Sequence, residues 1–207
     1  MFDAVLLTLP AFKLAELEFG GTAKFDLSSL AEIQYPPVAS VVFGFRREDV
    51  AHPIDGFGTL NPEVEGVNTL GTIFSSTLFP DRVPKGHVLL TTYVGGTRCP
   101  DNALKGEEEL FKLTLEDLRK IYGISGEPTF RQQFVYKRAI PQYNVGYGKY
   151  KDLMAKCEAD LPGVFIAGHC KDGISLGDSI VSGNDVAQRI GEFLGGNEAA
   201  AADTHTN

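Results

Sequence analysis

The feature that most constrains the fold is a short apolar segment followed by a glycine-containing loop and a helical pattern, in residues 163–194. Residues 163–167 read Gly-Val-Phe-Ile-Ala, which predicts a short strand, and residues 168–177 predict a loop before a helix at 178–194. On that helix, three small residues recur every four positions and therefore share one face: Gly183, Ala187 and Gly191. Such a face allows a sheet or a ligand to approach the helix backbone closely.

A strand, a glycine loop and a helix N-terminus in this order present free backbone N–H groups and a partial positive charge. This combination suits a phosphate or another negatively charged group. The chain contains no GxGxxG motif and no P-loop, and its Gly-x-Gly triplets at 56–58 and 146–148 lack the third glycine. From spacing alone, an ordinary strand-to-helix connection is therefore the favoured interpretation.

The rest of the chain predicts strands first and helices later. Residues 1–9 form a nearly continuous apolar run closed by Pro10, which predicts a strand buried inside a parallel sheet. Further strands are predicted at 38–45, 56–60, 68–77, 87–94 and 129–136, and helices at 107–122 and 145–161. Successive strands with short connections favour an antiparallel or mixed sheet, so we expect an α/β (mixed α+β) chain.

Composition and charge exclude several classes of protein. With 43% hydrophobic and 22% charged residues, the chain is typical of globular proteins. Its net charge is −8 and it has no run of Lys and Arg, so we expect no nucleic-acid partner. It has no apolar stretch of about 18 residues and no signal-peptide pattern, so we expect an intracellular protein without a membrane-spanning helix.

Few residues suggest side-chain catalysis or metal binding. The three cysteines, Cys99, Cys157 and Cys170, are odd in number and share no CxxC spacing, which predicts reduced thiols. The four histidines form no metal-ligand pair, and no Ser/His/Asp or Cys/His arrangement can be identified. We therefore assign no metal site and no catalytic side chain.

Five segments resemble a known family. Residues 162–183 (PGVFIAGHCKDGISLGDSIVSG) are similar to the C-terminal flavin-contacting motif of protoporphyrinogen oxidases, which belong to the amine-oxidase-like flavoproteins. The segments GFGTLNP (56–62), TLGTIFSSTLFPDRVP (69–84) and TTYVGGTR (91–98) resemble the plant-type branch of that family. The opening FDAVLLTLP resembles the strand that leads out of the FAD domain. The similarity runs in order from about residue 2 to residue 194.

The resemblance implies a substrate site for a flat tetrapyrrole. Leu60, Ile73 and Tyr93 match residues that sandwich this ring in the family. Relatives often have Leu and Phe where this chain has Ile73 and Tyr93, and the tyrosine adds a hydroxyl that needs a hydrogen-bond partner. From the residues alone, all three side chains would be assigned to the core of a sheet, and that interpretation stays open.

The resemblance also implies FAD as the cofactor. Tyr136 stands where relatives commonly have Trp beside the flavin. The loop expected to contact the cofactor contains Gly168, His169, Gly173, Ile174, Ser175 and Leu176. For His169, a polar loop residue is the favoured interpretation over a catalytic base. In this family the cofactor performs the oxidation, and the protein positions the reactants.

We expect four segments with different roles. Residues 1–35 provide the exit strand of the FAD domain and a linker, and residues 36–143 form a substrate-binding domain with a mixed sheet and a helix. Residues 144–195 form the C-terminal FAD-contacting segment, and residues 196–207 form a disordered tail. The family's dinucleotide fingerprint would precede Met1, so we expect the N-terminal Rossmann half to be missing and the chain alone to be inactive.

The complete enzyme implied by the resemblance removes hydrogens from protoporphyrinogen, with molecular oxygen as the final acceptor. Alternatives are another amine-oxidase-like flavoenzyme, acting on an amine or a carotenoid, and a non-catalytic truncated remnant. The expected partners are the tetrapyrrole substrate and the missing FAD-binding half, with a homodimer and peripheral membrane contact also compatible. The expected location is a bacterial cytoplasm or inner-membrane periphery, or a plastid or mitochondrion.

Overall fold

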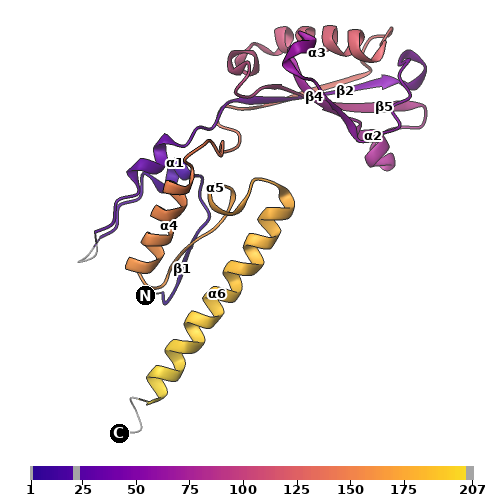
Figure 1. Ribbon diagram of the computed structural model, residues 1–207. Helices are drawn as coiled ribbons and strands as arrows, with labels where there is room; N and C mark the ends of the chain where they lie inside the picture. Colours follow the sequence, from indigo (N-terminus) through magenta and orange to yellow (C-terminus); the bar gives the residue numbers. More distant parts are fainter. Residues whose placement is uncertain (1, 21–23, 204–207) are drawn as a thin grey trace. The chain divides into compact units, whose positions relative to one another are not determined.

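The computed structural model describes residues 2–20 and 24–203. The chain divides into two compact units: unit 1 combines Met1–Tyr35 with Ile140–Asn207, and unit 2 is Pro36–Ala139 (Figure 1). The sequence predicts the second boundary at 143/144, four residues later. The segment before it belongs to unit 1 because the Gln142 N–H donates a hydrogen bond of 2.9 Å to the carbonyl of Gln34.

Unit 2 is built on a five-stranded sheet with the order β3-β4-β5-β2-β6. Its strands are β2 (Val38–Arg46), β3 (Gly58–Leu60), β4 (Thr69–Ile73), β5 (His87–Gly95) and β6 (Phe130–Tyr136). Every pairing in this sheet is antiparallel, whereas the sequence predicts a mixed sheet here. Strands β3, β4 and β5 follow one another along the chain without an intervening long helix and pair directly, which suits antiparallel pairing. A parallel pair lies in unit 1, so the mixed α/β class of the whole chain is confirmed.

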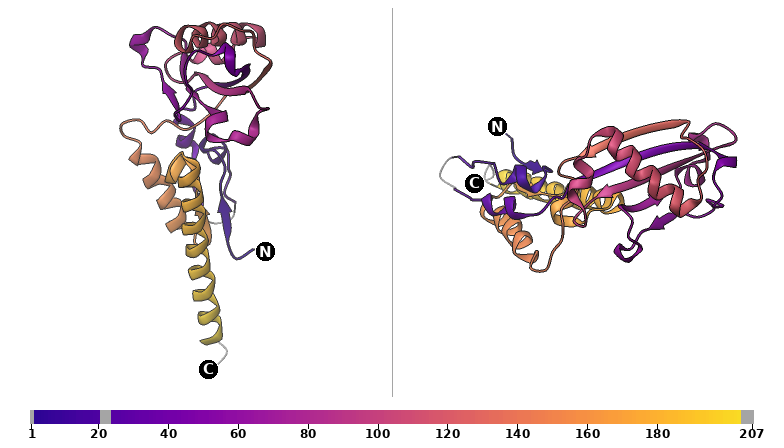
Figure 2. Two further views of the ribbon diagram at one scale, coloured as in Figure 1. Left: turned by 90° about the vertical axis from the view of Figure 1, so that its right-hand side faces the viewer. Right: turned by 90° about the horizontal axis from the view of Figure 1, so that it is seen from above.

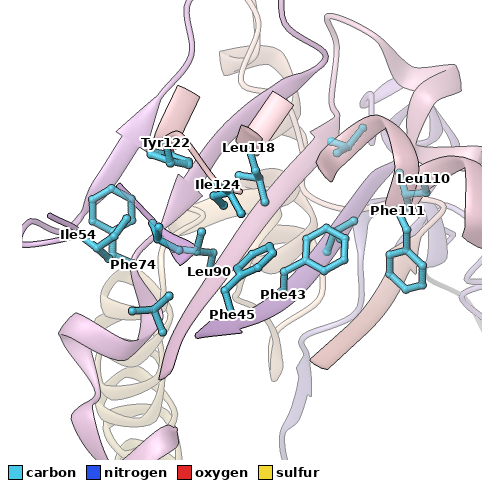
Figure 3. Close-up of a cluster of buried hydrophobic side chains, with 14 of the residues drawn as sticks. Phe43, Phe45, Ile54, Phe74, Leu90, Leu110, Phe111, Leu118, Tyr122 and Ile124 are labelled. Carbon is cyan, nitrogen blue, oxygen red and sulfur yellow. The ribbon is translucent and has the colours of Figure 1, made fainter. Parts of the chain in front are cut away.

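A single long helix of unit 2, α3 (Glu107–Tyr122), lies across one face of the sheet (Figure 2). The sequence explains both of its ends. Three glutamates occupy its first turn, at the positive end of the helix dipole, and Gly123 adopts a left-handed φ of 62° that terminates it. Its buried side chains include Leu110, Phe111, Leu118 and Tyr122 (Figure 3).

The alternation of side chains along β2 divides the sheet into a covered face and an open face. Phe43 and Phe45 are 1% and 0% exposed and pack in the core with Leu90 of β5 (Figure 3). The residues that alternate with these on β2, such as Ser40 and Val42, point to the opposite face, which α3 does not cover. The core of unit 2 therefore lies between the covered face and α3.

The segment predicted as one strand at 68–77 changes direction within its length. Strand β4 ends at Ile73, and the short helix α2 (Ser75–Leu78) follows. The Ser76 hydroxyl accepts a hydrogen bond of 3.0 Å from the Leu89 N–H, which replaces a backbone ladder bond to β5. The single-turn 3-10 helices of this unit are Arg47–Asp49, Glu63–Glu65, Pro80–Arg82 and Pro100–Leu104.

Unit 1 contains a two-stranded parallel sheet, in which β1 (Val5–Leu7) pairs with β7 (Val164–Ile166). Its helices are α1 (Ala11–Leu14), the 3-10 helix Ser28–Glu32, α4 (Gly148–Asp160), α5 (His169–Asp172) and α6 (Leu176–Asp203). The predicted parallel strand at the start of the chain is confirmed. Val5 and Leu6 are 46% and 41% exposed in the described chain, so the burial that such an apolar strand favours is not reached within these residues. In the described chain β1 has one neighbouring strand, and one side of it stays open.

The helix α6 extends beyond its predicted end at residue 194 and reaches Asp203. The sequence predicts a disordered tail from residue 196. The run of four alanines at 199–202 favours continuation of the helix because alanine has the highest helix propensity. Residues 204–207 lie outside the described residues. Among the helices of the described chain, none is long and apolar enough to cross a membrane.

A largely buried carboxylate ties four elements of unit 1 together. Glu158 of α4 accepts hydrogen bonds from the Ile166 N–H at 2.6 Å, from Lys171 at 2.8 Å and from Arg189 at 2.7 Å. Its side chain is 13% exposed. Burial acts to raise the pKa of Glu158, but these three hydrogen bonds outweigh it and hold the pKa below the usual 4.5. The carboxylate therefore joins α4 to β7, α5 and α6 in its charged form.

We predict that Phe43→Ala destabilises unit 2 by about 3–5 kcal/mol, because it leaves a cavity in a closely packed core. The measurement is urea unfolding followed by circular dichroism. Phe134→Ala is the matched control. Phe134 is 51% exposed on the same sheet, so its truncation should lower the free energy of unfolding much less. Equal losses in the two variants would contradict the assignment of the two faces.

We predict that Glu158→Gln lowers the stability of unit 1 by about 3 kcal/mol, because it leaves the largely buried Lys171 ammonium group and the partly exposed Arg189 guanidinium group without their counter-charge. Because the folded pKa of Glu158 is depressed, its contribution is present above pH 4.5 and is lost as pH falls through the folded value. Between pH 7 and pH 3, the melting temperature should therefore fall more steeply in the unsubstituted chain than in the variant. Parallel curves of melting temperature against pH for the two proteins would contradict this prediction.

Candidate functional site

The three residues predicted to contact substrate share the open face of the sheet in unit 2. Leu60 of β3 lies opposite Gly71 of β4, which lies opposite Tyr93 of β5. Residues directly opposite each other point to the same face of a sheet. Ile73 follows two residues after Gly71 on the same strand and therefore points to this face as well. The register thus brings all three predicted residues to one surface.

This surface is distinct from the core. The Thr59 and Thr72 side chains, one residue before Leu60 and Ile73, point the other way, and the Thr59 hydroxyl hydrogen-bonds to Tyr122 of α3. Leu60 is 89% exposed, which is unusual for a leucine and contradicts its alternative assignment to the sheet core. Tyr93 and Ile73 are half-buried at the same face.

Gly71 stands in the row between Leu60 and Tyr93 and is itself buried. A Cβ atom at Gly71 would lie 2.5 Å from the Thr59 carbonyl oxygen, so this position requires glycine. Neighbouring strands are about 4.8 Å apart, which separates the Cα atoms of Leu60 and Tyr93 by about 10 Å across the glycine. The Leu60 side chain covers the glycine, since its Cδ2 atom lies 3.3 Å from the position of a Cβ at Gly71. Leu60 and Tyr93 are thus the two apolar side chains that this row presents on the open face.

The open face continues onto the edge strand β6. Phe134 lies opposite Ser40, which lies opposite Tyr93, so Phe134 extends the row across the sheet. Tyr136, two residues further along β6, points to the same face and is 55% exposed. Phe134 is not among the residues predicted from the sequence, although the alternation Phe130, Gln132, Phe134 and Tyr136 is visible along the strand. Tyr136 lies in unit 2, whereas the other predicted cofactor residues lie in unit 1.

The predicted cofactor loop of unit 1 connects β7 to α6 and contains a single helical turn, α5. Gly168 enters this turn with φ 107° and Gly173 leaves it with φ 117°, a region that favours glycine. A Cβ atom at Gly173 would also lie 2.6 Å from Asp178. These two glycines therefore set the course of the loop, as the sequence pattern suggests. His169, between them, has an exposed side chain.

Ser175 caps the start of α6. Its hydroxyl accepts a hydrogen bond of 3.0 Å from the Asp178 N–H, and its own N–H donates one of 3.1 Å to the Asp178 carboxylate. The hydrogen bonds from Ser175 lower the pKa of Asp178. The first N–H groups of a helix have no acceptor within it, so those of Leu176 and Gly177 point beyond the helix end. Ile174 and Leu176 beside them are 42% and 81% exposed.

A serine of α6 secures the loop from one side. The Ser182 hydroxyl donates a hydrogen bond of 2.6 Å to the Asp172 carboxylate and accepts one of 3.3 Å from the Gly168 N–H. Ser182 is 5% exposed and lies one helical turn before Val186, which packs against Phe165 of β7. The predicted close-approach face lies elsewhere on the helix: within the described residues, no atom comes within 4 Å of a Cβ placed at Gly183 or Gly191. Close approach at that face stays a prediction.

Curated relatives of this chain include plant enzymes. Protoporphyrinogen oxidase, mitochondrial, of Nicotiana tabacum is 37% identical over 197 residues, which cover 93% of this chain and 39% of that protein. Protoporphyrinogen oxidase 2, chloroplastic/mitochondrial, of Arabidopsis thaliana is 38% identical with the same coverage. The chain thus spans about two fifths of the length of these relatives.

Solved structures share the fold. A candidate protoporphyrinogen oxidase from Exiguobacterium sp. 255-15 matches with a TM-score of 0.76 and 24% identity, over 91% of this chain and 41% of that one. Cyclohexylamine oxidase from Brevibacterium oxydans IH-35A matches with a TM-score of 0.61 and 13% identity, over 92% of this chain and 43% of that one.

The family model of flavin containing amine oxidoreductases matches residues 1–191, which include both the open face of unit 2 and the glycine loop of unit 1. Membership indicates FAD as the cofactor. The chain therefore belongs to the flavin-containing amine oxidoreductase family.

Proposed function

We propose that this chain provides the substrate face and the C-terminal cofactor loop of an FAD-dependent enzyme that oxidises protoporphyrinogen. The observation that carries the proposal is the shared open face of Leu60, Ile73 and Tyr93, which the strand register brings together. The plant relatives that cover 93% of this chain are named for this reaction.

The chemistry of the open face suits a large, flat and mostly apolar substrate. Leu60 and Tyr93 stand on either side of Gly71 in one row, and Ile73 adds an apolar side chain on the next row. Apolar pockets with few polar groups bind such ligands by burial of surface. The polar neighbours on this face, Ser40 and Gln132, are uncharged and can accept or donate hydrogen bonds at the rim.

The glycine loop suits the negatively charged edge of a flavin. The N–H groups of Leu176 and Gly177 point outward at the positive end of a 28-residue helix, where an anion is stabilised. The exposed side chains of Ile174 and Leu176 provide apolar contacts beside them. When bound, FAD supplies the acceptor for the hydrogens removed from the substrate. The residues of this chain orient the two reactants, and molecular oxygen is the final acceptor, yielding one hydrogen peroxide for each pair of hydrogens.

An amine substrate is less compatible with the aromatic residues near the loop. The Tyr143 and Tyr147 rings lie next to it, but their centroids are 4.2 Å apart and their planes differ by 31°. Two rings in such close contact leave no space for an ammonium group between them. A second porphyrinogen is the nearer alternative, because coproporphyrinogen III oxidase of Bacillus subtilis is 27% identical over 87% of this chain and 38% of that protein.

The names of the plant relatives point to a plastid or a mitochondrion, and we propose one of these compartments for the complete protein. Imaging of the complete protein with a fluorescent tag would test this location, and a diffuse cytosolic signal would contradict it. A homodimer and peripheral membrane contact stay predictions.

The test of the proposed function is a chimaera in which this chain replaces the corresponding segment of the tobacco mitochondrial enzyme. We expect it to bind FAD and to convert protoporphyrinogen to a fluorescent porphyrin, with coproporphyrinogen as the comparison substrate. A chimaera that binds FAD and folds but oxidises neither porphyrinogen would contradict the proposal. Preference for coproporphyrinogen would support the alternative.

In the same chimaera, we predict that Tyr93→Ala raises KM by about tenfold or more, with a smaller change in kcat. The reason is that the ring contact stabilises substrate and transition state alike. Tyr93→Phe keeps the ring and is the matched control, with KM close to that of the unsubstituted chimaera. Steady-state kinetics after correction for FAD content decides the point. An unchanged KM in Tyr93→Ala would place this side chain outside the substrate site.

A further inference from the structure

A tyrosine hydroxyl interrupts the hydrogen-bond ladder of α5 in the cofactor loop. The N–H groups of Lys171 and Asp172 both donate to the Gly168 carbonyl, at 2.9 and 3.0 Å. In a continuing α-helix, the next N–H, of Gly173, would donate to the carbonyl of His169. The Tyr143 hydroxyl occupies that place instead, since it donates to the His169 carbonyl and accepts from the Gly173 N–H at 3.1 Å.

The interruption explains why the helix stops after one turn. A side chain inserted between a helical N–H and its carbonyl opens the helix at that point. Gly173 adopts φ 117° and ψ 155°, which turns the chain away from the axis of α5. The two following apolar residues, Ile174 and Leu176, are exposed, and α6 starts with its own cap at Ser175.

Several contacts hold the Tyr143 side chain in this place. Its ring stacks on that of Tyr147, whose hydroxyl donates a hydrogen bond of 2.7 Å to the carbonyl of Cys170. The Lys151 ammonium group lies 5.5 Å from the Tyr143 ring centroid. Two tyrosines thus satisfy two successive carbonyls of α5, which a one-turn helix cannot satisfy itself. Desolvation is the largest cause that raises the pKa of Tyr143, so the hydroxyl keeps the proton that it donates.

We propose that Tyr143 is a positioning residue for the cofactor: its hydroxyl, inserted between Gly173 and His169, holds residues 173–177 in the course that presents their N–H groups to the flavin. This inference rests on the proposed function and assigns a role to a residue outside the loop itself. Without the hydroxyl, the Gly173 N–H bonds directly to the His169 carbonyl or opens to water. In both cases Gly173 moves, and the reciprocal bonds between Ser175 and Asp178 loosen.

The first experiment measures how well the loop amides are protected from hydrogen exchange in the 207-residue chain without cofactor. Hydrogen exchange, followed by NMR, should show the Ser175 and Asp178 amides at least about tenfold faster in Tyr143→Phe, as expected for the loss of hydrogen bonds at one hydroxyl. Tyr150→Phe is the matched control, because it removes a hydrogen bond of 3.0 Å to Glu32 and leaves the loop untouched. Unchanged exchange in Tyr143→Phe would overturn the proposal.

A second measurement covers the case in which Tyr143→Phe fails to fold. In the unsubstituted chain labelled at tyrosine, the Tyr143 hydroxyl proton should exchange slowly and show a nuclear Overhauser contact to the Gly173 amide. A freely rotating, rapidly exchanging hydroxyl would contradict its insertion between Gly173 and His169.

The last experiment measures the affinity of the chimaera for FAD and its steady-state kinetics. FAD affinity should fall by about tenfold or more in Tyr143→Phe and stay within about twofold in Tyr150→Phe. At saturating FAD, kcat should fall and KM for the porphyrinogen should stay unchanged, because the substrate residues lie in unit 2. Equal FAD affinity in the two variants would overturn the positioning role. Failure of the unsubstituted chimaera to bind FAD would contradict the proposed function instead.

Discussion

The arrangement of unit 2 depends on one constraint: α3 covers only one face of its sheet. A strand places successive side chains on opposite faces, so one covered face requires alternate residues to be apolar and buried. Along β2, Phe43 and Phe45 meet this requirement with almost no exposure. The same register directs Leu60, Ile73 and Tyr93 to the other face. Packing of the core therefore determines which side chains remain free to meet a ligand.

Two glycines occupy positions at which a side chain would clash with neighbouring atoms or require an unfavourable backbone angle. Gly71 allows β3 and β4 to approach closely and lets the Leu60 side chain lie over the backbone of β4. In unit 1, Gly173 accepts a backbone angle that other residues rarely adopt. Polar side chains then fix the backbone: Ser175 with Asp178 at the start of α6, and Tyr143 at the end of α5. The candidate site is thus built from backbone geometry supported by a few hydrogen bonds.

Local patterns were sufficient to predict several elements from the sequence. The helix at 107–122 has the predicted limits because acidic residues and Gly123 mark its ends within a few residues of the helix itself. The strand, loop and helix at 163–194 are present for the same reason, although the sequence analysis missed the single turn of α5. The helix α2 was missed because Ser75 and Ser76 interact with β5, which lies elsewhere in the sequence.

What the sequence could not reveal depends on residues far apart along the chain. Residue types alone assigned Leu60 to the core, and only the register of β3 against β4 places it on the open face. Tyr143 is separated by 26 and 30 residues from its two partners in the loop, and no periodic pattern connects them. The exposure of Val5 and Leu6 depends on the number of strands beside β1, which local hydrophobicity does not encode.

The open face of unit 2 as a tetrapyrrole-binding surface is the central claim, and methyl NMR of the 207-residue chain titrated with protoporphyrin IX tests it most directly. The account predicts the largest ring-current shifts at the methyl groups of Leu60 and Ile73, which lie on the open face. The methyl groups of Leu90 and Leu118, in the core between sheet and helix, should shift little. Shifts confined to the core or to α3, or no shifts at Leu60 and Ile73 while porphyrin binds, would contradict it.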